Sequence, residues 1–116
     1  MELKLVVEKY VEDKFSIASA NKRKVEVYEI GNYSVKVVTY PSGAHYITVR
    51  KEVGSEYLPD IYCRDNDDGD VCGFEIQTTS YGAISAEETK KMIEALNEAV
   101  EVVNILTNKF LKQEEC

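Results

Sequence analysis

The sequence predicts an α+β fold in which a four- to five-stranded antiparallel sheet is covered by a long C-terminal helix and a short N-terminal helix. Apolar residues recur at helical spacing after residue 85, and short alternating runs separated by turn residues fill the middle of the chain. The apolar fraction of 44% and the charged fraction of 30% are typical of globular proteins. A chain of this length is expected to form one domain, residues 1–116.

Residues 2–13 carry two overlapping patterns. Five apolar residues occupy helical spacing, namely Leu3, Val6, Val7, Tyr10 and Val11. The alternation of Leu3, Leu5 and Val7 is instead typical of a strand. We predict a helix because the helical pattern is the longer one. Phe15 and Ile17 then alternate, which indicates the start of a strand, and residues 21–24 resemble a polar turn.

The middle of the chain predicts a meander. Residues 25–30 and 33–40 flank Gly31-Asn32, a two-residue hairpin turn that pairs Ile30 with Tyr33. A three-residue loop at Pro41-Ser42-Gly43 then pairs Val37 with Ile47. This register places seven apolar side chains on one face: Tyr28, Ile30, Tyr33, Val35, Val37, Ile47 and Val49.

A second hairpin is expected from residues 61–65 and 71–78 around Asn66–Gly69. Its core face comprises Ile61, Cys63, Cys72, Phe74 and Ile76. The simplest register sets Cys63 directly opposite Cys72, within disulfide range. We favour two reduced, buried thiols because a cytosolic chain is normally kept reduced, and a disulfide remains the alternative. Cys116 is expected to be free in either case.

The C-terminal helix is the longest predicted element. Ser85 and Glu88 form a capping box at its start. An apolar stripe follows, made of Met92, Leu96, Ala99, Val103, Leu106 and Phe110, with Ile93 and Val100 widening one side. A helix over residues 86–112 is about 40 Å long, whereas a strand of five or six residues spans under about 20 Å. Its last turns, residues 103–110, are therefore expected to need cover from the N-terminal segment or from a second copy in a homodimer.

The charge is concentrated in residues 52–75, whose net charge of −7 equals that of the whole chain. Only Arg64 opposes the carboxylates of this acidic segment, which are Glu52, Glu56, Asp60, Asp65, Asp67, Asp68, Asp70 and Glu75. Such a field attracts basic surfaces and repels nucleic acids and anionic membranes. A solvated surface that keeps the protein soluble is the alternative interpretation.

Tyr40 and Tyr46 fall on the face of the meander opposite the core, together with Val27 and Val38. Either the N-terminal segment covers these side chains, or they form an exposed patch of the kind that binds a partner. We therefore count both tyrosines as candidate partner-binding residues.

No motif for catalysis or metal binding stands out. The loop from Asp65 to Asp70 resembles a calcium loop, but that alignment puts Arg64 where a carboxylate is required. His45, the only histidine, starts a strand and has no metal-ligand neighbour in sequence. No nucleophile elbow or phosphate-binding glycine loop is visible. We predict no enzymatic activity, no cofactor and no metal.

The run from Phe74 to Gly82 (FEIQTTSYG), with SAEET at Ser85–Thr89, resembles small uncharacterised phage and prophage proteins of Gram-positive bacteria. Acidic phage proteins of this kind include inhibitors of bacterial defence such as anti-CRISPR proteins, several of which present carboxylates to a positively charged nucleic-acid groove. The resemblance implies that possibility and assigns no role to any single residue.

These observations predict a non-enzymatic acidic binding protein whose segment 52–75 docks on a basic protein surface. Its most concrete form is a phage-encoded, anti-CRISPR-like inhibitor of a nucleic-acid-handling defence enzyme such as a nuclease, acting in the cytoplasm of a bacterial host. No direct contact with nucleic acid or membrane is expected. The alternatives are an oligomerising structural protein that uses the C-terminal helix and a small carboxylate- or metal-dependent enzyme.

Overall fold

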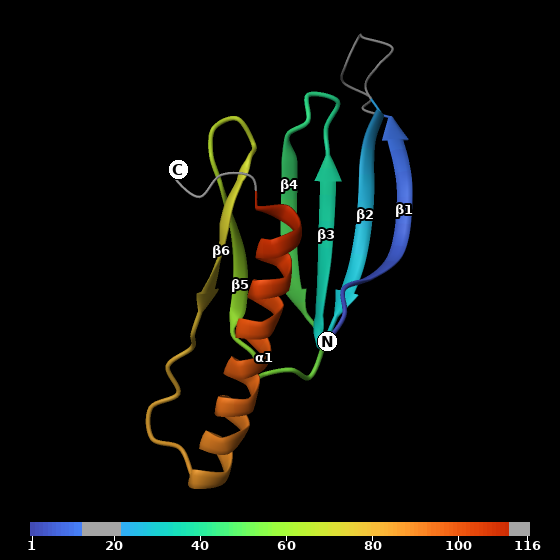
Figure 1. The fold of residues 1–116 in the computed structure, drawn as a ribbon. Coiled ribbons are helices and arrows are strands. Elements are labelled where there is room, and N and C mark those ends of the chain that lie inside the picture. The colour runs from blue at the N-terminus through green and yellow to red at the C-terminus, as the bar shows by residue number, and fades with distance from the viewer. Residues whose placement is uncertain (13–21, 112–116) are drawn as a thin grey trace.

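The computed structural model describes residues 1–12 and 22–111. These form strands β1 (Lys4–Glu12), β2 (Lys22–Ile30), β3 (Tyr33–Thr39), β4 (His45–Lys51), β5 (Asp60–Asp65) and β6 (Val71–Gln77), then helix α1 (Ala86–Phe110). Strands β1 to β4 make an antiparallel sheet in chain order, and β5 and β6 make a separate hairpin beside it (Figure 1). The predicted α+β class is confirmed. The predicted strand start at Phe15 and Ile17 lies outside the described residues.

The predicted N-terminal helix is wrong, because this segment is the edge strand β1. Its residues pair antiparallel with β2, with Glu8 opposite Glu26. The register shifts between Leu5 and Val7, so the extra residue Val6 interrupts the strand alternation and produces the spacing that resembled a helix. Strand β2 begins at Lys22, so the predicted polar turn does not extend over Lys22–Lys24. Backbone pairing with β2 outweighs a weak helical pattern here.

The predicted meander is confirmed in register. Ile30 pairs with Tyr33, and Val37 pairs with Ile47. The core is built where the sheet, the hairpin and α1 meet. Its buried members are Tyr28, Ile30, Tyr33, Val35, Val37, Ile47, Leu58, Ile61, Val71, Ala99, Val102 and Leu106. We call the side of the β1–β4 sheet that carries these residues the inner face, and the opposite side the outer face.

The predicted register of the second hairpin is wrong. Cys63 lies opposite Phe74, and Cys72 is the extra residue where the register shifts. The tip closes at Asp70, whose carbonyl accepts a hydrogen bond from the Asn66 amide at 3.1 Å, so the loop is one residue longer than expected. The two cysteines therefore do not face each other, and the alternative of a disulfide between them is also wrong because Cys63 is a free thiol. Cys116 lies outside the described residues.

Helix α1 begins at the predicted capping box, where the Glu88 amide donates to Ser85 Oγ at 3.1 Å. Its fully buried residues are Ala99, Val102 and Leu106, and of the predicted stripe Ala99 and Leu106 are buried while Val103 and Phe110 pack against the core. Ile93 and Val100 do not widen the buried stripe, since they are 54% and 50% exposed.

The part of α1 that lacks cover is its N-terminal half, which extends beyond the ends of the strands in Figure 1. The predicted need to cover the last turns is wrong, because Val103, Ile105 and Phe110 pack against the core. The chain leaves β6 at Gln77 and reaches Ala86 through an eight-residue connection. This connection lets the helix start past the strands and return over them.

Candidate functional site

The tip of the β5–β6 hairpin, residues 65–70, presents four carboxylates on a fixed backbone. Asn66 Oδ1 accepts hydrogen bonds from the amides of Asp68 and Asp70, both at 3.0 Å. The tip is also tied to the sheet, because the His45 amide donates to the Gly69 carbonyl at 3.0 Å. These bonds leave the side chains of Asp65, Asp67 and Asp68 exposed to solvent.

The tip carboxylates are electrostatically unsatisfied within the part of the chain that the structure describes. The ion pairs of that part engage other acids, and none includes Asp65, Asp67, Asp68 or Asp70. A charge held in a rigid loop without an internal partner is available to a cation of another molecule. Of the predicted acidic segment, the tip therefore gathers the most carboxylates without an ion-pair partner among the described residues.

The other predicted acidic residues lie elsewhere. Glu52, Glu56 and Asp60 belong to the opposite end of the hairpin, where the connection from β4 approaches α1. Two of the predicted residues are already paired: Asp60 with Lys51 Nζ at 3.5 Å, and Glu75 with Arg64 at 3.7 Å. The segment that is continuous in sequence is thus divided between two ends separated by the length of β5, about 20 Å.

A hollow of about 240 Å³ lies between this connection and α1. It is lined by Glu56 together with two acidic residues of the helix, Glu94 and Glu98. Glu98 Oε1 accepts a hydrogen bond from Asn32 Nδ2 at 2.8 Å, and Glu98 Oε2 is buried without a partner. Sequence analysis did not identify this site, because residues 66 positions apart meet only in the fold.

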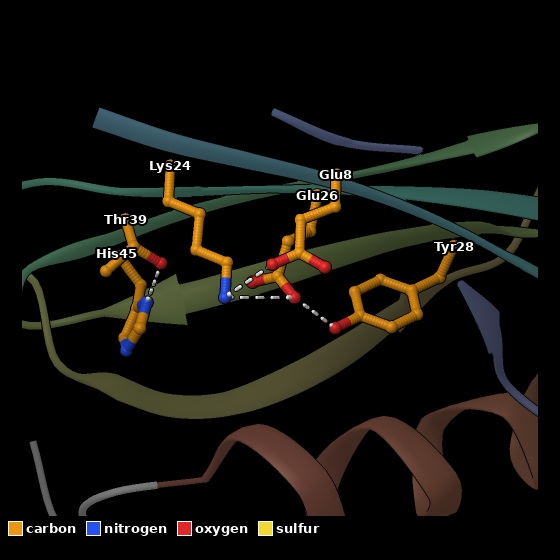
Figure 2. Close-up of polar contacts among 6 residues, drawn as sticks. All are labelled: Glu8, Lys24, Glu26, Tyr28, Thr39 and His45. Carbon is orange, nitrogen blue, oxygen red and sulfur yellow. Dashed lines mark hydrogen bonds and ion pairs between the residues drawn. The ribbon is translucent and has the colours of Figure 1, made fainter. Parts of the chain in front are cut away.

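A polar network occupies the inner face beside the C-terminal end of α1 (Figure 2). Lys24 Nζ lies 3.1 Å from Glu8 and 4.0 Å from Glu26, and the Tyr28 hydroxyl donates to Glu26 at 2.6 Å. The hydrogen bond with Glu8 raises the pKa of Lys24, and burial together with Glu26 raises the pKa of Tyr28 to about 12. Lys24 is therefore held as a cation and Tyr28 as a neutral phenol, and both interact with Glu26.

His45 lies at the edge of this network, where its Nδ1 is 3.1 Å from Thr39 Oγ1 (Figure 2). It starts β4, as expected from the sequence. Among the residues that the structure describes, no group of three or more histidine, cysteine, aspartate or glutamate side chains is arranged to hold a metal ion.

The two candidate tyrosines lie on the outer face of the sheet. Tyr46 is 59% exposed and Tyr40 is 37% exposed. The alternative in which residues 2–12 cover them is wrong, because β1 extends the edge of the sheet next to β2 instead of crossing its face. The tyrosines and the hairpin tip are neighbours at the start of β4, since His45 bonds to Gly69 and precedes Tyr46.

The chain matches no family model, no curated protein and no solved structure. Within its described residues, no helix is long and apolar enough to cross a membrane. Its function is therefore inferred from the geometry of its surfaces.

Proposed function

We propose that this protein is a non-enzymatic binding protein that docks the carboxylates of its hairpin tip on a basic protein surface. The observation that carries the proposal is the fixed backbone at Asn66, which orders four carboxylates that have no ion-pair partner among the described residues. Ordering before binding lowers the entropic cost of association, and complementary charge raises its rate.

The most concrete form is a phage-encoded, anti-CRISPR-like inhibitor that acts in the cytoplasm of a bacterial host. Its target would be the nucleic-acid groove of a defence nuclease, where rows of lysine and arginine normally bind phosphates. The closely spaced carboxylates at the tip would bind the same cations and exclude the nucleic acid. The chain itself would touch neither nucleic acid nor membrane.

The test is the reversal of Asp65, Asp67 and Asp68 to lysine, measured against a panel of purified RNA-guided nucleases by inhibition of DNA cleavage and by biolayer interferometry. The wild-type protein should inhibit at least one nuclease, and the reversed variant should bind it at least about 100-fold more weakly, because three attractive charges become repulsive. Binding of the wild type should also weaken as salt is raised.

A matched control changes the net charge equally at exposed sites away from the tip, by reversing Glu2, Glu12 and Glu87. This control should retain most of the inhibition. Equal affinity of wild type and tip variant would refute docking through the tip. Failure of every nuclease in the panel to bind would refute the anti-CRISPR form of the proposal.

A further inference from the structure

The outer face of the β1–β4 sheet carries a groove of about 650 Å³ with an unusual lining. Its floor is formed by valines of the first three strands, Val7, Val11, Val25, Val27 and Val38. Three cations, Lys9, Arg23 and Lys36, also line it, and Tyr40 and Tyr46 lie toward β4. None of the described residues that line this groove is a carboxylate, in a chain whose net charge is −7.

The three cations of this groove have no carboxylate partner among the described ion pairs, unlike Lys24 and Lys51. Lys24 and Lys51 form ion pairs with carboxylates at 3.1 and 3.5 Å. In contrast, none of the described ion pairs includes Lys9, Arg23 or Lys36. Arg23 Nε is also buried without a hydrogen-bond acceptor. A buried donor without a partner is costly, so an acceptor supplied by another molecule would stabilise this site.

We propose that the outer face binds a segment of another protein in which apolar side chains lie beside carboxylates, as in an acidic amphipathic helix. The valine floor would bury the apolar stripe of that helix, while the lysines and Arg23 bind its flanking carboxylates. Four strands about 4.8 Å apart span roughly 14 Å, which accommodates one helix of about 10–12 Å diameter. This surface adjoins the acidic tip but does not include its carboxylates.

The lining favours an acidic protein segment over single-stranded nucleic acid. Bases bind proteins largely by stacking on planar side chains, whereas five valines form the floor and the two tyrosines of the lining lie only at its β4 side. An extended polyanion that continued past Tyr46 would also meet the tip, because the His45 amide is bonded to Gly69 beside four aspartates. A short helix can end before that point.

The probe is a fluorescein-labelled synthetic helical peptide of eighteen residues, with a leucine stripe flanked by glutamates, titrated with the full-length protein and followed by anisotropy. Replacing Lys9 and Lys36 with glutamate should weaken binding at least about 10-fold, because two attractions become repulsions. Reversal of the exposed Lys22 and Lys90, which do not line the groove, changes net charge equally and should have little effect.

A second variant tests the surface without changing its charge. Tyr46→Ser should weaken binding several-fold, and its circular dichroism should remain that of the wild type because the side chain is 59% exposed. Amide chemical-shift changes on peptide binding should map to outer-face residues of β1 to β4. A peptide with lysine in place of glutamate, and a scrambled peptide, should bind poorly.

Several results would overturn the proposal. They are no binding of the acidic peptide, equal binding by the Lys9/Lys36 variant, or shifts confined to the inner face. Tighter binding of an oligothymidylate than of the acidic peptide would assign the groove to nucleic acid instead. Self-association of the free protein that the Lys9/Lys36 reversal abolishes would assign it to a second copy.

Discussion

Gly69 is the residue at which the acidic tip touches the sheet. Its φ is +78°, and a Cβ added there would lie 2.5 Å from Ala44 Cβ. The close approach allows the bond between the Gly69 carbonyl and the His45 amide. The position of the tip carboxylates therefore depends on a residue that carries no charge.

Replacing Gly69 with alanine should destabilise the protein more than replacing Gly43. Both glycines have positive φ, which costs an alanine about 1–2 kcal/mol, but nothing lies within 4 Å of the Gly43 position. The collision with Ala44 should add about 1–3 kcal/mol at Gly69. Urea denaturation of the two variants measures the difference, and Ala44→Gly should recover part of the loss at Gly69. Equal losses would show that the tip does not rest on β4.

Single residues also show what the sequence alone could not predict. The four tip aspartates were predicted as binding residues from composition, but their order depends on Asn66, whose side chain accepts two backbone amides. Cys63 was predicted to face a second thiol. It is instead a half-buried free thiol whose pKa is raised to about 11 by burial. The error arises from a one-residue bulge at Cys72, which no local sequence pattern predicts.

At the scale of the elements, turn chemistry was decisive. Gly31-Asn32 and Pro41-Ser42-Gly43 each fix a loop length, and with it the register of β2, β3 and β4. Strand β1 has no such turn within the described chain. The register shift between Leu5 and Val7 also interrupts the alternation of apolar and polar residues that identifies a strand. The sequence also predicted that α1 is longer than the sheet. It predicted the wrong end to overhang, because the overhanging end depends on the path of the connection after β6.

The buried half of α1 should hold most of the helix's contribution to stability. Leu106 is fully buried in the core, so Leu106→Ala should lower the free energy of unfolding by about 2–5 kcal/mol. Val100 is half exposed on the same helix, and Val100→Ala should change it by no more than about 0.5 kcal/mol. Urea denaturation followed by circular dichroism measures both. A large loss at Val100 would indicate that another surface covers this side of the helix.

The whole molecule separates its charges over a body of 58 × 30 × 24 Å. Carboxylates gather at the hairpin tip and along the N-terminal half of α1, whereas Lys9, Arg23 and Lys36 line the outer-face groove. The Debye length is about 30 Å at 0.01 M salt and about 10 Å at 0.1 M. At the lower salt an approaching ligand responds to the net charge of −7, and at the higher salt it responds to the nearest surface.

This separation predicts an unusual salt dependence for the outer face. The association rate constant of the acidic helical peptide should rise between about 0.01 and 0.1 M salt, as screening removes the repulsion by carboxylates outside the groove. It should fall at higher salt, when the attraction of Lys9, Arg23 and Lys36 is screened as well. Stopped-flow anisotropy measures the rate.

Two variants serve as controls. The Lys9/Lys36 reversal should abolish the fall in rate at higher salt, because these attractions no longer contribute. Reversal of Asp65, Asp67 and Asp68 should raise the rate at low salt. A rate that decreases steadily from the lowest salt in the wild-type protein would show that carboxylates outside the groove do not oppose binding of the peptide.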